Sequence, residues 1–286
     1  MRLIVFVLLL CVSWATFAQQ QELQWQGKTL TAKLLQESDH NKERIFVLVH
    51  GTWAHYDMEI ISTLQGLLSE AGHSSLAINL SLGVDKRKGF LSCDEPVRSR
   101  QSDAAAEIAL WLAHLKQSWP EIILLGHSRG GLHVAMLNQQ ILDQAGVSYL
   151  VLLAPMVSSR ETVAVSYEKR FGESLADAID RAHQAGSGFL EVGMHHCEKV
   201  RATGESFLSY YGPDVALNSL SFVKDSRRPV LIAVGTEDNL MREYSRLRES
   251  VTGNKFIEEY SIDGADHFFR DLYADELIEK VLEWSE

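Results

Sequence analysis

Short apolar runs alternate with helical patterns along most of the chain. The apolar runs occupy residues 44–49, 75–82, 121–125, 147–153, 230–234 and 256–262. Segments with apolar residues three and four positions apart occupy residues 58–71, 102–118, 130–142, 240–250 and 269–284. Strands that are apolar throughout are typically buried on both faces. The pattern therefore predicts an α/β fold, with a mostly parallel sheet and helices on both of its faces.

Two segments depart from this alternation. Residues 23–25 and 29–35 alternate between apolar and polar positions around Gly27-Lys28, which predicts a two-stranded hairpin. Residues 156–228 contain no run typical of a buried strand, and helical patterns occupy residues 174–184 and 197–208. We therefore expect one domain over residues 19–286, with a small helical cap inserted at about 156–228.

The first 18 residues have the pattern of a secretory signal peptide. Arg2 precedes an unbroken apolar run over residues 3–12, and Ala18 precedes three glutamines. The run is shorter than the roughly 20 residues that a membrane-spanning helix needs, although an uncleaved anchor is the alternative. We expect cleavage after Ala18 and an exported protein, periplasmic or secreted, without stable membrane insertion after cleavage.

The charge of the chain excludes one class of partner. The net charge of the 286 residues is −11, and loss of Arg2 with the signal peptide makes it about −12. Because an acidic protein repels phosphate backbones, we expect no nucleic-acid partner.

Two cysteines remain once Cys11 leaves with the signal peptide. Cys93 and Cys197 in an exported protein indicate a possible disulfide, and two unrelated thiols are the alternative.

Polar residues follow four of the predicted strands. These strand-end segments are His50-Gly51-Thr52-Trp53, Gly126-His127-Ser128-Arg129-Gly130, Gly235-Thr236-Glu237-Asp238 and Asp263-Gly264-Ala265-Asp266-His267. Ligands of such sheets bind beyond the carboxyl ends of the strands, so these segments are the first place to look for chemistry.

Ser128 lies between a predicted strand and a predicted helix, in the pattern Gly126-x-Ser128-x-Gly130. This is the pattern of a nucleophile elbow, a strained turn that exposes the serine hydroxyl. Larger residues at positions 126 and 130 would clash with the adjacent backbone. We predict that Ser128 is a catalytic nucleophile; an incidental serine in a glycine-rich turn is the alternative.

A serine nucleophile needs a base and a group that orients the base. His267 follows the last predicted strand and is the expected base, and Asp238 is the expected orienting acid. The order Ser, Asp, His is the order that this kind of site uses. Glu237 is the second choice for the acid, and the alternative role of Asp238 is to cap a helix from Leu240 onward.

Backbone N–H groups near the nucleophile are expected to form an oxyanion hole. Arg129 would supply one, and Thr52 or Trp53 would supply the other. The side chain of Arg129 has two interpretations: it pins the start of the helix through a carboxylate, or it reaches toward an anionic substrate.

With these four segments in this order, the chain resembles the α/β-hydrolase superfamily from about Arg44 to the C-terminus. Residues 79–85, with Cys93 and residues 98–100, also resemble a group of exported bacterial hydrolases of unknown substrate. The resemblance implies the α/β-hydrolase fold and a serine hydrolase that is carboxylesterase- or lipase-like. No cofactor is expected, and the sequence shows no spacing typical of a metal site.

The predicted function is hydrolysis of a carboxylic ester through an acyl-enzyme, with a small-molecule ester or acyl compound as substrate. A thioesterase, an amidase or an acyltransferase would use the same residues. A binding protein that kept the fold without the chemistry is an alternative of another class.

Overall fold

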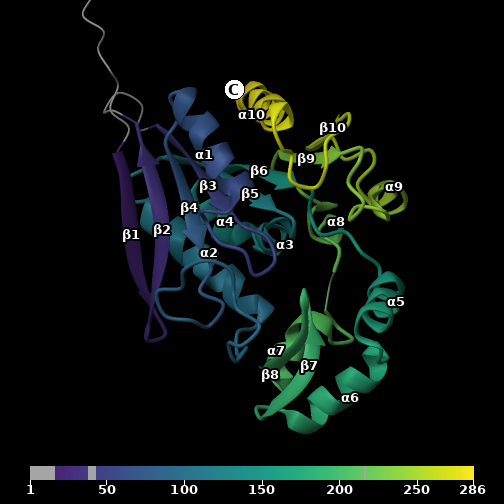
Figure 1. Cartoon of the computed structure of the whole chain (residues 1–286). Coiled ribbons are helices and arrows are strands. Elements are labelled where there is room, and N and C mark those ends of the chain that lie inside the picture. The colour runs from purple at the N-terminus through teal and green to yellow at the C-terminus, as the bar shows by residue number, and fades with distance from the viewer. Residues whose placement is uncertain (1–16, 38–42, 216) are drawn as a thin grey trace, which may run out of the picture.

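Eight strands of the described chain form one sheet in the order β1-β2-β4-β3-β5-β6-β9-β10 (Figure 1). The structure is a computed structural model, and it describes residues 17–37, 43–215 and 217–286. The strands are β1 Phe17–Trp25, β2 Lys28–Gln36, β3 Arg44–Val49, β4 Ser75–Asn79, β5 Glu121–His127, β6 Val147–Leu153, β9 Val230–Gly235 and β10 Ile257–Ile262.

The sheet is parallel from β4 to β10, whereas β1 pairs with β2, and β2 with β4, in the antiparallel sense. Strands β3 and β9 are buried along nearly their whole length, as their apolar sequences predict. The predicted mostly parallel sheet and the N-terminal hairpin are confirmed. The carboxyl ends of β3, β5, β9 and β10 therefore meet at one edge of the sheet.

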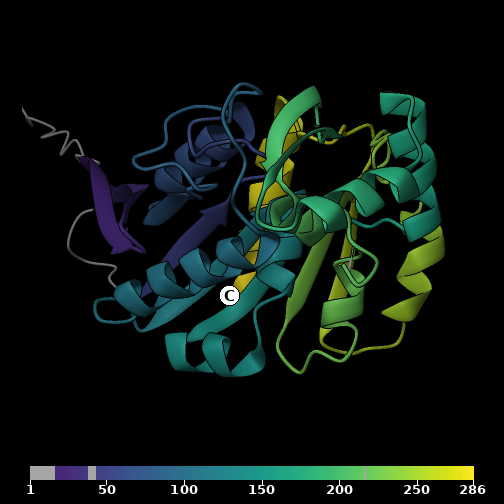
Figure 2. The ribbon, with the colours of Figure 1, turned by 90° about the horizontal axis from the view of Figure 1, so that it is seen from below.

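Helices cover both faces of the sheet (Figures 1 and 2). Helices α1 (Glu59–Glu70) and α10 (Leu272–Ser285) pack against each other on one face. Helices α2 (Gln101–Leu115), α3 (Arg129–Ala135) and α4 (Gln139–Ala145) form the other layer. The predicted two-sided coverage of the sheet is confirmed.

Two of the predicted helices are interrupted or short. The helix expected at residues 130–142 is two helices, because the Asn138 side chain accepts a hydrogen bond from the Ile141 N–H and starts α4 anew. In place of the helix expected at residues 240–250, only α9 (Tyr244–Leu247) and a 3₁₀ turn (Arg248–Ser250) form.

The inserted cap is not wholly helical. It comprises α5 Arg160–Phe171, α6 Leu175–Ala185, β7 Phe189–Met194, β8 Cys197–Thr203 and α7 Gly204–Tyr211. The helix expected at residues 197–208 is wrong in its first half, because Cys197–Thr203 pairs with β7 as an antiparallel hairpin. Buried Val200 and Ala202 flank exposed Arg201, which is the period of two of a strand.

The insertion leaves the sheet after β6 and returns before β9, and these two strands are parallel neighbours. Because parallel neighbours need a crossover, the chain must return from the carboxyl end of β6 to the end of the sheet at which β9 begins. Short helix α8 (Leu220–Val223), which packs against α3, lies on this return path. The cap proper, α5 to α7 with β7 and β8, lies apart from the sheet layers in Figure 1.

The expected signal peptide falls largely outside the described residues. Of its 18 residues, only Phe17 and Ala18 are described, and they pair with Gln36 and Leu35. No helix in the described ranges is long and apolar enough to cross a membrane.

Candidate active site

Ser128 occupies the sharp turn from β5 into α3. Its backbone angles are φ 56° and ψ −120°, a conformation that a residue with a side chain adopts only under strain. A Cβ at position 126 would lie 2.5 Å from the Gly130 carbonyl oxygen, and a Cβ at position 130 would lie 2.4 Å from the Val49 carbonyl oxygen. The steric reason expected for both glycines is confirmed.

Gly130→Ala is expected to destabilise the fold by about 3 kcal/mol. The new methyl group would press on the carbonyl oxygens of Val49 and His50, and neither can move without displacing β3. Urea unfolding of the variant measures this loss. Gly66→Ala is the matched control: Gly66 lies in α1, and no atom of the described residues outside its own helix turn lies within 4 Å of an added Cβ, so this change should be neutral or stabilising. Equal stability of the two variants would contradict the steric argument.

The structure brings Asp238 and His267 together. His267 Nδ1 lies 2.6 Å from Asp238 Oδ2, and the Asp238 side chain is fully buried. The other oxygen, Oδ1, accepts a hydrogen bond of 2.8 Å from the Leu240 N–H, although no helix begins at Leu240. Both carboxylate oxygens are thus engaged, and one of them holds the imidazole. Glu237, the second choice, is exposed.

The loops that carry Asp238 and His267 are bound to each other. The Glu237 N–H donates to the Ala265 carbonyl at 3.0 Å, and the Thr236 N–H donates to the Ile262 carbonyl at 3.1 Å. A side chain at Gly235 would collide with the Ala265 carbonyl, at 2.2 Å. The close packing of these loops fixes the distance between the Asp238 carboxylate and the His267 ring.

His127 has a role that sequence reasoning missed. Its Nε2 lies 2.9 Å from the carbonyl oxygen of His267, and its ring packs on the His267 ring at 4.9 Å between centroids. Burial, followed by the charge of His267, lowers the pKa of His127 to about 3, so the ring is neutral and donates its Nε2–H. This contact joins the elbow to the His267 loop across 140 residues of sequence, and no local sequence pattern predicts it.

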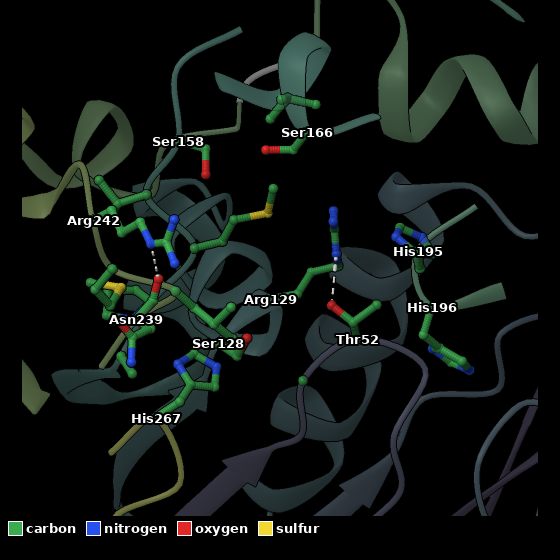
Figure 3. Close-up of a pocket in the computed structure, with 18 of the residues that line it drawn as sticks. Thr52, Ser128, Arg129, Ser158, Ser166, His195, His196, Asn239, Arg242 and His267 are labelled. Atoms are coloured by element: carbon green, nitrogen blue, oxygen red, sulfur yellow. Dashed lines mark hydrogen bonds between the residues drawn. The ribbon is translucent and has the colours of Figure 1, made fainter. Parts of the chain in front are cut away.

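Ser128 and His267 lie side by side at the floor of a cavity (Figure 3). Their side chains, both of which the structure describes, are not hydrogen-bonded to each other. Such contacts are commonly loose before a substrate binds.

The loop after β3 lies against the elbow. A Cβ at Gly51 would come 3.2 Å from the Ser128 Cβ. The buried His50 ring fixes this loop: its Nδ1–H donates to the Gly51 carbonyl at 2.9 Å, and its Nε2 accepts from the Leu80 N–H at 3.1 Å. Because the Gly51 carbonyl and the Thr52 N–H belong to one planar trans peptide, fixing the carbonyl orients the N–H in the opposite direction.

The three residues predicted for the oxyanion hole differ in placement. Thr52 and Arg129 line the cavity, whereas Trp53 is not among the described residues that line it. The Trp53 indole is buried and packs on the rings of His195 and His196 in the cap. The positions of Thr52 and Arg129 fit the predicted role better than that of Trp53.

The cavity has a volume of about 900 Å³ and lies between the sheet edge and the cap. Its walls include α5, the β7–β8 turn with His195 and His196, and the loop that follows Asp238. A volume of this size suits a small-molecule substrate.

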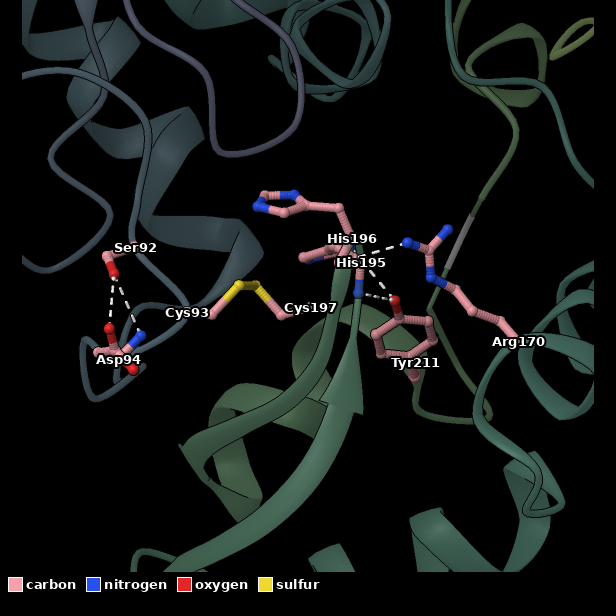
Figure 4. Close-up of a disulfide and its surroundings, with 8 residues drawn as sticks. All are labelled: Ser92, Cys93, Asp94, Arg170, His195, His196, Cys197 and Tyr211. Carbon is pink, nitrogen blue, oxygen red and sulfur yellow. Dashed lines mark hydrogen bonds between the residues drawn. A yellow bond between two sulfur atoms is a disulfide. The ribbon is translucent and has the colours of Figure 1, made fainter.

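A disulfide between Cys93 and Cys197 ties the cap to the loop after β4 (Figure 4). The Cα atoms lie 5.6 Å apart. Such bonds persist in oxidising compartments, the kind that the expected export implies, while the location itself stays a prediction. His196 lies beside the two sulfurs, a grouping that resembles a metal site, but sulfurs joined to each other offer no thiolate ligands.

Buried histidines predict that the fold is sensitive to acid. Burial lowers the pKa of both His127 and His133 to about 3, and neither ring nitrogen of His133 has a hydrogen-bond partner among the described residues. Below pH 6.5 these two histidines bind protons in the unfolded chain but stay neutral in the folded chain. The stability that is present above pH 6.5 is therefore lost as the pH falls toward 3. The expected loss between pH 7.5 and pH 5 is about 2 kcal/mol for each histidine.

Urea unfolding at the two pH values measures this loss. His133→Leu should remove about half of the contribution of the pair, because a leucine at this position does not titrate. An unfolding free energy that is the same at pH 5 and pH 7.5 would contradict the prediction.

Comparison with known proteins identifies the family. Residues 46–280 match the Alpha/beta hydrolase family. No curated protein sequence matches the chain. Among solved structures, Est1E from Butyrivibrio proteoclasticus is similar with a TM-score of 0.65 and 18% identity, covering 93% of this chain and 97% of its own.

Two further structures have the same architecture. The esterase Pf2001 from Pyrococcus furiosus has a TM-score of 0.62 at 15% identity, covering 95% of this chain and 90% of its own. The mouse alpha/beta hydrolase domain-containing protein 10 has a TM-score of 0.61 at 13% identity, covering 93% and 98%. These identities show the fold alone. The family match spans most of the chain, and the protein therefore belongs to the alpha/beta hydrolase family.

Proposed function

We propose that the protein is a serine hydrolase that cleaves a carboxylic ester through an acyl-enzyme, with Ser128, His267 and Asp238 as its catalytic residues. The observation that carries the proposal is the buried Asp238–His267 hydrogen bond of 2.6 Å at the edge of a cavity that also contains Ser128. A buried carboxylate on Nδ1 leaves Nε2 free to accept a proton.

The proposed reaction has two halves. Ser128 Oγ attacks the ester carbonyl carbon while His267 Nε2 takes the hydroxyl proton, and the N–H groups of Thr52 and Arg129 stabilise the oxyanion. The tetrahedral intermediate collapses, and the alcohol leaves with the proton from His267. Water then attacks the acyl-enzyme with His267 again as base, which releases the acid and restores the Ser128 hydroxyl.

The backbone around the site supports the oxyanion part of the proposal. Arg129 is the first residue of α3, where helix N–H groups have no partner within the helix and the helix dipole is positive. The His50 ring holds the Gly51–Thr52 peptide beside Ser128. Donors that are fixed before the substrate arrives need no reorganisation when negative charge develops.

The test combines turnover with covalent labelling. We expect the mature protein to hydrolyse at least one p-nitrophenyl ester in a series from acetate to palmitate. We also expect a fluorophosphonate to label Ser128 and not Ser158 or Ser166, which line the same cavity. Labelling at Ser128 without hydrolysis of any ester would mean that the serine is active and the substrate is not an ester. Absence of both would favour a binding protein.

A further inference from the structure

The Arg129 side chain carries a positive charge that no carboxylate of the described residues neutralises. The residue is only 7% exposed, yet its guanidinium makes no ion pair with a described carboxylate. Its Nε donates to Thr52 Oγ1 at 3.2 Å, and its Nη1 donates to Gln101 Oε1 at 2.8 Å. Both partners are neutral. The sequence left two interpretations of the Arg129 side chain open, and the one in which it holds the start of the helix through a carboxylate is wrong.

The neighbours of the guanidinium are aromatic and neutral. It lies over the Tyr210 ring at 5.5 Å. Burial raises the pKa of both Tyr210 and Tyr211, so their phenols are neutral. Burial lowers the pKa of Arg129, yet a guanidinium in a protein stays protonated. An unpaired buried charge is costly, and an anionic ligand that pairs with the guanidinium would offset that cost.

The guanidinium is also accessible from the cavity. Arg129 is among the lining residues, and its side chain rises from beside Ser128 into the space toward His195 (Figure 3). No described group accepts a hydrogen bond from Nη2, and at most one N–H bond of Nη1 is used. The free N–H bonds are enough to hold a carboxylate by two hydrogen bonds.

Three further cationic side chains line the cavity. Lys169, Arg170 and Arg242 also line it, and none makes an ion pair with a described carboxylate. Glu243, the acid among the described lining residues, is already bound to Ser159 and Arg246. A cationic cavity in a chain of net charge −11 favours anionic ligands over neutral ones.

We propose that the substrate carries a carboxylate in addition to the ester that is cleaved, and that the Arg129 guanidinium binds this carboxylate. The inference rests on the proposed function, because it places the reacting ester at Ser128. A single buried guanidinium balances the single charge of a carboxylate, whereas the other three cations attract the substrate to the cavity mouth.

The test compares substrates that differ only in charge. The probes are p-nitrophenyl monoesters of adipic, suberic and sebacic acid, each paired with the compound in which the far carboxylate is a neutral amide. For at least one chain length, we expect kcat/KM of the anionic member to be about tenfold or more higher, the range for a hydrogen bond to a charged group. A protein that prefers the amide at every length would overturn the proposal.

Arg129→Gln should lower the ratio of the two kcat/KM values by about ten- to a hundredfold. The ratio is the readout because any damage to the oxyanion hole lowers both values together. Arg227→Gln, an exposed arginine outside the cavity lining, is the matched control and should keep the ratio. An equal fall in the ratio for Arg242→Gln would show general attraction and overturn the assignment to Arg129.

A binding measurement separates this proposal from the proposed function. Calorimetry of monomethyl suberate with Ser128→Ala needs no turnover, and adding Arg129→Gln should raise its Kd about tenfold or more. Binding that is absent, or unchanged by Arg129→Gln, would overturn the carboxylate site even if neutral esters are hydrolysed. Binding that depends on Arg129 without any esterase activity would support the carboxylate site and overturn the ester chemistry.

Discussion

Ser128→Ala is expected to lower kcat for p-nitrophenyl ester hydrolysis by about 10⁶-fold, as loss of a serine nucleophile does in comparable sites. The variant keeps the cavity, the Asp238–His267 hydrogen bond and the backbone N–H groups, so substrate binding should persist while the acyl-enzyme cannot form. Steady-state kinetics of the purified protein measure the loss. The strained turn tolerates alanine as well as serine, so thermal stability should be close to that of the wild type.

Ser166→Ala is the matched control for this prediction. Ser166 lies on α5 and lines the same cavity, but it belongs to the cap. Its activity should stay within the same order of magnitude as the wild type. If Ser166→Ala and Ser128→Ala lose activity equally, the nucleophile assignment is wrong.

Asp238→Asn is expected to lower kcat by about 10⁴-fold with little change in structure. The asparagine would keep the hydrogen bond from the Leu240 N–H, but its amide would donate to His267 Nδ1 instead of accepting from it. The imidazole would then carry its proton on Nε2, facing Ser128, and could not act as the base. Kinetics with the best p-nitrophenyl ester measure the effect.

Glu237→Gln tests whether the effect of Asp238→Asn is specific. Glu237 is the neighbouring acid, it is exposed, and its backbone rather than its side chain holds the loop. Its activity should be unchanged. If Glu237→Gln is the more damaging variant, then Glu237 is the acid that orients His267.

The sheet, and the polar segments at the carboxyl ends of its strands, could be predicted because each depends on local sequence. An apolar run such as residues 44–49 is a buried strand wherever it lies, and the glycines around Ser128 are required by contacts within one turn and its neighbouring strand. The order of strand-end segments along the chain then indicated which side chains meet, and the structure brings Asp238 to His267.

Other features of the site and the cap could not be predicted, because they depend on contacts between distant segments that no local sequence pattern encodes. The His127 bond to the His267 carbonyl and the neutral surroundings of Arg129 arise only when distant segments meet. The helix predicted over residues 197–208 is wrong for strand β8 because Glu198 and Lys199, both exposed, break the alternation of this strand and give it a helical spacing. The sequence left the pairing of Cys93 with Cys197 open for the same reason.

The cap is inserted between the neighbouring strands β6 and β9, so the cap and the sheet can be treated as separate modules. Strands β6 and β9 keep their register through their own pairs, such as Leu150 with Val230, and none of these pairs involves the segment between them. A different cap could therefore be grafted at this point, provided that it supplies a partner for Cys93 or that Cys93 is replaced. Descent or engineering can thus change the wall that the cap contributes to the cavity, while Ser128, Asp238 and His267, which lie outside residues 156–228, stay in place.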